Sequence, residues 1–240
     1  PEALWPAGRV RKLVILSATI SRKDIDRLGL SSRRVCYLEC DSPIAAERRP
    51  IYVEPVTYVT RNRRSKSTTD IAQWLVRTML ERPKEKGLVH VTYEQAGYLR
   101  SSLRGWEGAD RLLFHTAESK AHVYDQFQQA PPESGMVLVG AGMQEGLDLA
   151  GDLGRWQAIA KIPWPSLADQ AISTLAERDP SWYTWETLRL VMQACGRICR
   201  GPEDRGDTYI LDATFERLYR EATEHNLVPS WWRDAIVGYD

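Results

Sequence analysis

Short runs of valine, isoleucine and leucine alternate along this chain with longer stretches of helical period. Runs such as Leu88–Val91, Met136–Val139 and Ala158–Ile162 are too short for helices and are typical of buried strands. Amphipathic stretches lie before the first of these runs, near Thr68–Glu81, and between the first two, near Glu118–Gln129. Strands that alternate with helices form parallel sheets, because each crossover returns the chain to the edge where the previous strand began. The pattern therefore predicts an α/β fold, a parallel sheet with helices on both faces.

The other predicted elements continue this alternation. Further strands are predicted at Lys12–Ser17, Arg34–Glu39, Ile51–Thr60, Leu112–His115 and Thr208–Leu211. Further helices are predicted at Lys23–Leu30, Glu94–Leu103, Leu167–Glu177, Thr184–Arg200 and Thr214–His225. Residues 61–67 are predicted to form a polar, basic loop. Several α/β sheet families share this order of elements, so the order alone does not identify a function.

The charge balance excludes a chain that is basic over its whole surface. Lys and Arg together number 32, as do Asp and Glu, so the formal net charge is zero. A nucleic-acid contact would therefore have to be a local stripe of basic side chains. The sequence contains no run of about 20 apolar residues to span a bilayer. Its N-terminus lacks a signal-peptide pattern and is interpreted as that of a chain cut from a longer one. We expect no membrane partner and a cytoplasmic location.

The four cysteines form two C-x3-C pairs, Cys36 with Cys40 and Cys195 with Cys199. One interpretation is a four-cysteine metal site. However, Cys195 and Cys199 recur at helical spacing within an apolar stripe, which indicates buried thiols. We predict no metal site.

The segment Leu188–Arg200 has the most specific pattern in the chain. On a helix that turns about 100° per residue, its apolar side chains fall on one side. The opposite side carries Gln193, Gly196, Arg197 and Arg200. Two guanidiniums beside a residue without a side chain suit a polyanion such as triphosphate. The alternative is a solvated helix face whose arginines pair with nearby acids such as Glu203 and Asp204.

Residues 193–200 read QACGRICR, which matches the Q-x-x-G-R-x-x-R pattern of helicase motif VI. An acidic, glycine-containing turn follows, and then a strand that ends in Leu211-Asp212. This order resembles the DinG and XPD family of superfamily-two DNA helicases. The resemblance implies a RecA-like motor domain in which Arg197 and Arg200 are arginine fingers for ATP. It also implies a catalytic role for Gln193 and a nucleotide contact at Gly196.

Residues 140–149 read GAGMQEGLDL and follow a predicted strand. They are not a dinucleotide-binding fingerprint, because Glu145 stands where G-x-G-x-x-G requires its third glycine. They resemble the family's E-G-x-D segment, which implies that Glu145, Gly146 and Asp148 contact the nucleotide, with Asp148 accepting a hydrogen bond from a ribose hydroxyl. Glycines that only form a tight turn are the alternative. The family has an aromatic residue where this chain has Gln144.

Further segments resemble the DNA-facing and coupling motifs of the family. Thr92 and Tyr93 follow a strand and are expected to contact DNA, although Thr92 is also expected to cap the next helix. Arg63 and Arg64 are candidate DNA contacts, and a solvated loop is the alternative. Ser17-Ala18-Thr19 resembles motif III, which implies that the hydroxyls of Ser17 and Thr19 couple the ATP state to DNA binding.

Two elements of ATP hydrolysis are missing from the sequence. It has no Gly-Lys dipeptide for a P-loop and no Asp-Glu pair for metal-bound ATP. The resemblance implies that ATP and Mg²⁺ are bound mainly by a first motor domain upstream. Residues 1–20 are predicted to end that domain, and residues 21–240 to form the second RecA-like domain.

The predicted function is the C-terminal motor half of an ATP-dependent DNA helicase. Its expected partners are single-stranded DNA and the upstream domain, and its expected translocation is 5′ to 3′. This fragment alone is not expected to hydrolyse ATP. The alternatives are a catalytically decayed binding or scaffold module and an RNA-directed motor.

Overall fold

The computed structural model of the chain describes residues 12–30, 34–143 and 147–238. It divides into two compact units, Pro1–Asp41 and Ser42–Asp240. The predicted boundary after residue 20 falls inside the first unit. The assignment of residues 1–20 to another motor domain stays a prediction.

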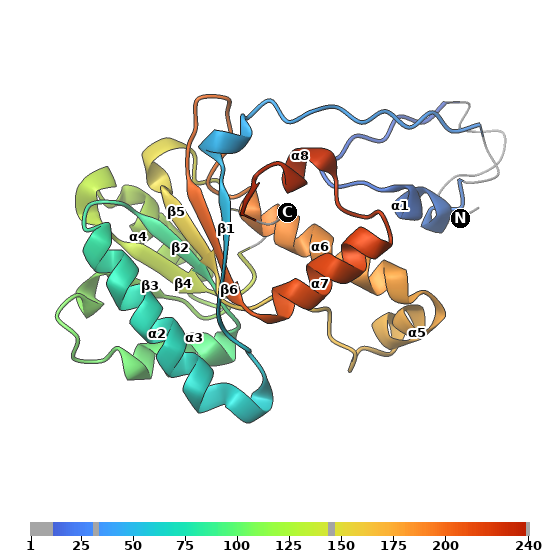
Figure 1. The fold of residues 1–240 in the computed structure, drawn as a ribbon. Helices are drawn as coiled ribbons and strands as arrows, with labels where there is room; N and C mark the ends of the chain where they lie inside the picture. The colour runs from blue at the N-terminus through green and yellow to red at the C-terminus, as the bar shows by residue number, and fades with distance from the viewer. Residues whose placement is uncertain (1–11, 31–33, 144–146, 239–240) are drawn as a thin grey trace. The chain divides into compact units, whose positions relative to one another are not determined.

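A seven-stranded parallel sheet forms the centre of the second unit (Figure 1). Its strands are β1 (Ile51–Thr57), β2 (Gly87–His90), β3 (Leu112–Phe114), β4 (Val137–Gly140), β5 (Trp156–Ile159), β6 (Asp207–Asp212) and β7 (Ile236–Val237). The spatial order is β3-β4-β2-β5-β6-β1-β7, and every paired neighbour is parallel. The predicted α/β fold with a RecA-like parallel sheet is confirmed.

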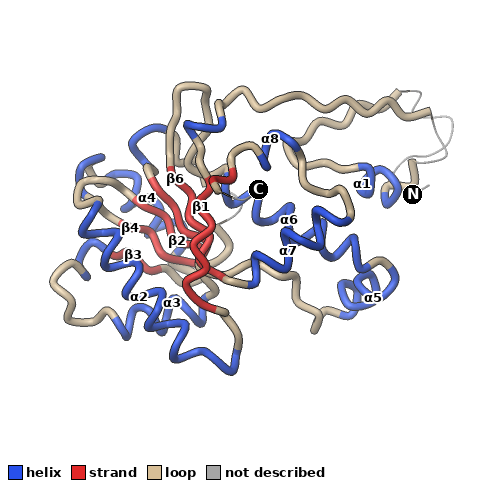
Figure 2. The backbone as a smooth tube through the Cα atoms, viewed as in Figure 1, coloured by secondary structure: helices blue, strands red, loops and turns tan. Residues whose placement is uncertain are grey.

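Helices cover both faces of this sheet (Figure 2). They are α2 (Arg64–Glu81), α3 (Tyr93–Ser102), α4 (Lys120–Gln129), α5 (Gln170–Arg178), α6 (Pro180–Cys195), α7 (Thr214–Glu224) and α8 (Ser230–Arg233). Because side chains alternate along a strand, Val89 and Ala158 pack in the core with α2 and α3. Leu88 packs with α4 and Ile159 with α6 and α7 on the other face.

Three predicted helix boundaries were wrong by four residues or more, among them the start of α6, which lies at Pro180 instead of Thr184. The predicted basic loop at 61–67 is a short 3-10 turn followed by α2, which begins at Arg64 because Ser67 already packs in the buried face of that helix. The predicted helix Thr184–Arg200 ends at Cys195, where Gly196 caps it. Helix α8 and strand β7 were not predicted.

The predicted strands at Lys12–Ser17 and Arg34–Glu39 are not strands in the structure. Both segments lie in the first unit with helix α1 (Arg22–Arg27), and neither has a strand neighbour among the residues described. Their apolar side chains stay accessible: Val14 is 79% exposed and Leu16 is 89% exposed. A strand requires a hydrogen-bonded partner, and the described part of the chain supplies none for these segments.

Candidate nucleotide and DNA sites

The arginines of the motif VI segment lie just beyond the C-terminal end of α6. The N–H of Gly196 donates to the carbonyl of Met192 at 3.1 Å, and the N–H of Arg197 donates to that of Ala194 at 3.1 Å. The second bond spans three residues instead of four, so the chain leaves the helix at Arg197. The prediction that one helix face carries the whole motif is therefore wrong: Gln193 lies on α6, and Arg197 and Arg200 lie in the turn after it.

Arg197 ties this turn to the segment that follows β4. Its guanidinium donates to the carbonyl oxygens of Gln193 and Leu147, both at 3.0 Å. The backbone adds a third bond, from the N–H of Leu149 to the carbonyl of Arg197 at 3.3 Å. The side chain is half-buried. Carbonyl oxygens from two segments that are distant in the sequence thus hold the guanidinium of Arg197 in place.

Arg200 pairs with Asp148, a residue 52 positions away in the sequence. Nε of Arg200 lies 3.1 Å from Oδ1 of Asp148, and the two side chains are 44% and 67% exposed. An ion pair this accessible contributes only about 0–1 kcal/mol. An anionic ligand can therefore replace Asp148 beside Arg200 at little cost. Of the predicted nucleotide residues, the structure brings together Arg197, Arg200 and Asp148.

Asp204 fixes the backbone at Arg200. Its carboxylate accepts the N–H groups of Arg200, Gly201 and Gly151, at 2.8, 2.9 and 3.1 Å. Burial opposes ionisation of Asp204, but these donors outweigh it and lower the pKa of the carboxyl. The alternative interpretation had Asp204 neutralise the charge of Arg197 or Arg200. In the structure the carboxylate of Asp204 instead accepts backbone N–H groups.

The remaining predicted nucleotide contacts are less informative. Glu145 and Gly146, together with Gln144, lie outside the described residues. Gly196 has a φ of −79° and caps α6. A Cβ at this position would approach only the carbonyls of Gln193 and Met192, at 3.7 Å. Packing inside the chain therefore does not require a glycine there.

A buried polar pair behind α6 was missed by the sequence analysis. Oε1 of Gln157, on β5, lies 3.2 Å from Nε2 of His90, on β2. Both side chains are buried, and both point to the face that α6 covers. The signal was a glutamine inside an otherwise apolar strand.

This pair predicts an acid-sensitive stability. Burial and the charge of Arg197 lower the pKa of His90 from 6.5 to about 4. Between these values the unfolded chain binds a proton that the folded chain does not, so stability falls as the pH falls. The shift corresponds to about 3 kcal/mol in the free energy of unfolding.

We expect urea denaturation at pH 7 and pH 4 to show this loss of stability, and His90→Leu to remove it. The control His122→Gln, at an exposed position on α4, should keep it, and an unchanged pH dependence in His90→Leu would contradict the assignment.

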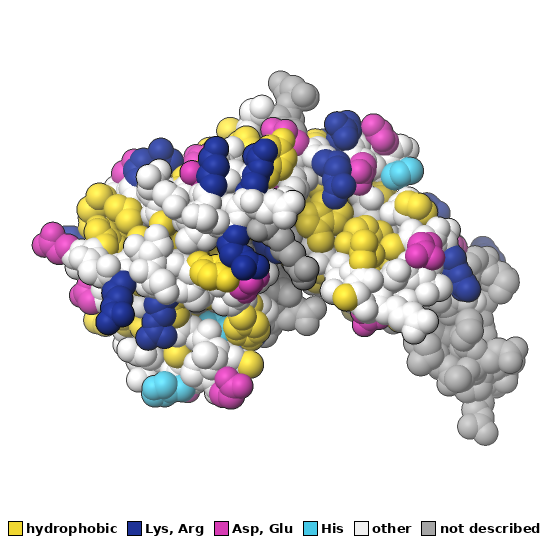
Figure 3. Space-filling model, turned by 90° about the horizontal axis from the view of Figure 1, so that it is seen from below, with side chains coloured by type: hydrophobic (Ala, Val, Ile, Leu, Met, Phe, Trp, Pro, Cys, Tyr) yellow, Lys and Arg dark blue, Asp and Glu magenta, His cyan; other side chains and the backbone are white. Residues whose placement is uncertain are grey.

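The predicted DNA contacts lie at the carboxyl ends of the strands. Thr92 caps α3, its Oγ1 accepting the N–H of Gln95 at 3.2 Å, as the capping interpretation expected. Tyr93 is 47% exposed. Arg64 pairs with Glu94 at 2.6 Å, which brings the start of α2 beside Tyr93. The guanidinium of Arg63 lies 5.5 Å from the ring centre of Tyr58. On the face shown in Figure 3, Lys and Arg lie in several separate places instead of one continuous field.

A pocket of about 300 Å³ opens beside Thr92 and Tyr93. Its walls come from the last residues of β2, β4 and β5, from the residues that follow these strands and from α6, and they include Gly140, Lys161 and Trp164. Lys161 and Trp164 were not predicted as site residues, although they follow β5 as Thr92 follows β2. The pocket combines an ammonium group, a hydroxyl and aromatic rings, which suits a phosphate next to a base.

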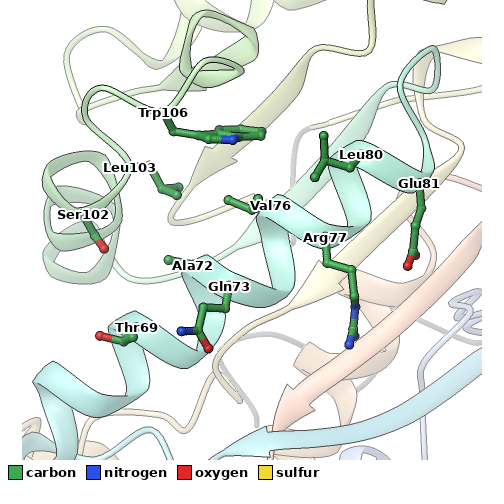
Figure 4. Close-up of a pocket in the computed structure, with 10 residues that line it drawn as sticks. All are labelled: Thr69, Ala72, Gln73, Val76, Arg77, Leu80, Glu81, Ser102, Leu103 and Trp106. Carbon is green, nitrogen blue, oxygen red and sulfur yellow. The ribbon is translucent and has the colours of Figure 1, made fainter.

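A larger hollow of about 720 Å³ lies along α2 (Figure 4). Val76, Leu80, Leu103 and Trp106 give it a mainly apolar lining. Arg77 and Glu81 project from the same helix along its side. Such a lining does not suit phosphate chemistry, so we assign this hollow no part in the nucleotide or DNA sites.

The coupling residues and the cysteines complete the predicted set. In the first unit, Oγ of Ser17 accepts the N–H of Thr19 at 3.1 Å, and Thr19 is buried.

Burial raises the pKa of Cys195 to about 12 and that of Cys199 to about 11, so both stay protonated thiols. The described residues contain no cluster of three or more His, Cys, Asp or Glu side chains able to hold a metal ion.

The sheet order and the flanking helices define an α/β domain of the RecA-like class, and comparison with known proteins identifies its family. The model of the helicase C-terminal domain family matches residues 77–235. The chain belongs to this family, and the predicted resemblance to an XPD/DinG-type C-terminal helicase domain is confirmed. Within the described part of the chain, no helix is both long and apolar enough to cross a membrane.

Two similar relatives are homologues of regulator of telomere elongation helicase 1. The one from Anopheles gambiae is 29% identical over 131 residues, which cover 48% of this chain and 13% of the relative. The one from Caenorhabditis briggsae is 23% identical over 209 residues, which cover 72% and 20%. The chain thus spans a fifth or less of the length of these relatives.

Solved structures share the fold. S. tokodaii Xpd4 matches with a TM-score of 0.54 and 17% identity, over 78% of this chain and 37% of that one. An XPD helicase matches with a TM-score of 0.56 and 20% identity, over 74% and 34%. S. cerevisiae Dbp5 bound to RNA and ADP BeF3 matches with a TM-score of 0.57 and 13% identity, over 89% and 49%.

Proposed function

We propose that this chain is the C-terminal motor half of an ATP-dependent DNA helicase. The observation that carries the proposal is the meeting of Arg197, Arg200 and Asp148, from two distant segments, at one place on the surface. Permanent positive charge with an accessible ion pair suits a group that reaches the triphosphate of ATP. ATP and Mg²⁺ would be held mainly by the upstream first motor domain, which would supply the missing P-loop and Asp-Glu pair.

In this mechanism, closure of the two motor domains brings Arg200 onto the γ-phosphate. Arg200 exchanges Asp148 for the phosphate, and Asp148 becomes free to accept a hydrogen bond from the ribose. Arg197 stays anchored on Gln193 and Leu147 and adds its charge to the same region. Developing charge on the transferred phosphoryl group is stabilised by both guanidiniums. Hydrolysis releases this contact, and the domains open again.

Residues 1–20, which lie in the first unit, would belong to the upstream motor domain. The segment 12–17 has a strand-like sequence whose apolar side chains are exposed, among them Val14 and Leu16. Exposed apolar runs of this kind are explained if they pair with strands of a sheet in the complete protein. Ser17 and Thr19 would then lie where the ATP state is communicated to the DNA.

Single-stranded DNA would run past the carboxyl ends of β1, β2, β4 and β5, with 5′ to 3′ translocation. Thr92, Tyr93 and Lys161 line the pocket there, and Arg63 and Arg64 stand exposed nearby. Phosphate contacts would hold the strand and aromatic rings would stack on its bases.

The double variant Arg63→Ala/Arg64→Ala tests this track. Each lost phosphate contact lowers the slope of log affinity against log salt by about 0.7 for single strands. We expect a slope reduced by about 1.4 and weaker binding of oligo-dT at low salt, measured by fluorescence anisotropy on the complete protein. Arg220→Ala, which removes an exposed arginine on α7, is the control. Equal slopes in the wild type and the double variant would mean that Arg63 and Arg64 are only solvated side chains.

ATPase measurements on the complete protein test the function itself. A DNA-directed motor hydrolyses ATP faster with single-stranded DNA than without it, and faster than with RNA of the same length. Greater stimulation by RNA would instead indicate an RNA-directed motor. No hydrolysis with either polymer, in a protein that still binds DNA, would identify a decayed binding module and overturn the proposal.

A further inference from the structure

The sheet supplies a hydrogen bond to the end of α6. Gln157 is fully buried on β5, and its Nε2 donates to the carbonyl oxygen of Cys195 at 2.7 Å and to Oγ1 of Thr208 at 2.9 Å. Cys195 is the last residue of α6, two positions before Arg197. The last four carbonyls of a helix have no donor within the helix. Gln157 is the donor for the final one.

The donors to the other three carbonyls come from the turn itself. The N–H of Gly196 donates to the carbonyl of Met192, and the N–H of Arg197 donates to that of Ala194. The guanidinium of Arg197 donates to the carbonyl of Gln193. These bonds shape the turn but do not fix it to the sheet. Among these four donors, Gln157 is the one that belongs to a strand.

The orientation of the Gln157 amide follows from its partners. A carbonyl oxygen can only accept, so Nε2 must face Cys195, and Oε1 must then face His90. The imidazole therefore donates from Nε2. Burial and the charge of Arg197 keep His90 neutral by lowering its pKa to about 4. The neutral ring holds the amide in the orientation in which it binds the end of α6.

We propose that Gln157, oriented by His90, is a positioning residue that sets where the arginine fingers stand. The inference rests on the proposed function of Arg197 and Arg200. Without the bond to Cys195, the end of α6 loses its hydrogen bond to the sheet. The position of Arg197, two residues later, then depends on its remaining bonds, among them those to Gln193 and Leu147, and becomes less well defined. A displacement of about 1 Å at a catalytic group costs roughly 10²-fold in rate.

Steady-state ATPase of the complete protein tests this with Gln157→Met, which keeps the length of the side chain and removes its donor. We expect kcat to fall by about 10- to 100-fold, while KM for ATP stays within about twofold because ground-state binding is unaffected. The matched control is Thr187→Val. Thr187 is also fully buried and lies on α6, but its hydroxyl bonds only within the helix, to Tyr183 at 2.8 Å. This control should keep its kcat.

A double-mutant cycle with Arg197→Ala separates positioning from general destabilisation. If Gln157 acts through the finger, Gln157→Met should have little further effect on kcat in the Arg197→Ala background. An equal factor in both backgrounds, or no loss of kcat in the single variant, would overturn the inference. An Arg197→Ala protein with normal ATPase would instead overturn the proposed function.

Should the methionine variant fail to fold, Gln157→Asn replaces it. Its amide stays beside Thr208 but is one methylene too short to hold Cys195 as Gln157 does. For Gln157→Asn we expect the same fall in kcat, the same unchanged KM and the same result in the double-mutant cycle with Arg197→Ala.

Discussion

Alanine at Arg197 or at Arg200 is expected to lower kcat for ATP hydrolysis by about 10³-fold or more in the complete protein. Arginine fingers contribute about 10³- to 10⁵-fold in rate because they meet charge that develops on the transferred phosphoryl group. Arg200 has a side chain that is 44% exposed and an accessible partner, and Arg197 is bonded to carbonyl oxygens. The ion pair of Arg200 is accessible, so its positive charge remains available to a ligand. Steady-state ATPase with single-stranded DNA measures the effect.

The control for this prediction is Arg220→Ala, which removes an exposed arginine from α7. Its kcat should equal that of the wild type. Thermal unfolding should show that the Arg200→Ala protein keeps its stability, since an exposed pair adds at most about 1 kcal/mol. A loss of less than tenfold for both arginine variants would count against their assignment as fingers.

Asp212→Ala is expected to destabilise the second unit by about 3 kcal/mol or more. The carboxylate is 1% exposed and lies at the end of β6. It accepts the N–H groups of Ile162 and Thr214, each at 3.0 Å, and that of Val59 at 3.4 Å. Each buried donor left without a partner costs about 1–3 kcal/mol. Urea denaturation of the chain at pH 7 measures the change.

An exposed aspartate provides the comparison for Asp212. Asp169 caps α5 and accepts the N–H groups of Ala171 and Ile172, but water can replace it. Asp169→Ala should therefore cost only about 1 kcal/mol. Similar losses for the two variants would show that Asp212 does not join the ends of β1 and β5 to the start of α7.

The sheet could be predicted because its strands are buried on both faces. Such strands are continuous apolar runs, and Val137–Gly140 and Trp156–Ile159 lie within a few residues of their predicted places. The same signal gave wrong strands at 12–17 and 34–39. An apolar run shows that a segment tends to be buried, and it does not show which part of a protein buries it.

The end of α6 could not be predicted from its apolar period. Ile198 and Cys199 continue the period and are buried, although the helix has already ended at Cys195. Ile198 is buried because it packs closely on Gly154, where an added Cβ would lie 2.8 Å from it. The apolar period therefore predicted correctly that Ile198 and Cys199 are buried, and predicted incorrectly that they are helical.

The sequence predicted which residues belong to the candidate site, but it did not predict most of the contacts between them. Motif spacing named Arg197, Arg200 and Asp148, which do lie together. It could not show that Asp148 pairs with Arg200 or that Gln157 holds the end of α6, because both contacts join segments far apart in the sequence. Lys161 and Trp164 were missed for the same reason.

Binding of a transition-state analogue tests the central claim most directly. Fingers whose contact with the γ-phosphate strengthens as charge develops on it increase the affinity for ADP with aluminium fluoride far more than the affinity for a non-hydrolysable ATP analogue. We predict that Arg200→Ala weakens binding of ADP–aluminium fluoride to the complete protein by about the factor lost in kcat and leaves binding of the ATP analogue within about twofold. Unchanged affinity for ADP–aluminium fluoride would show that Arg200 does not complete an ATP site.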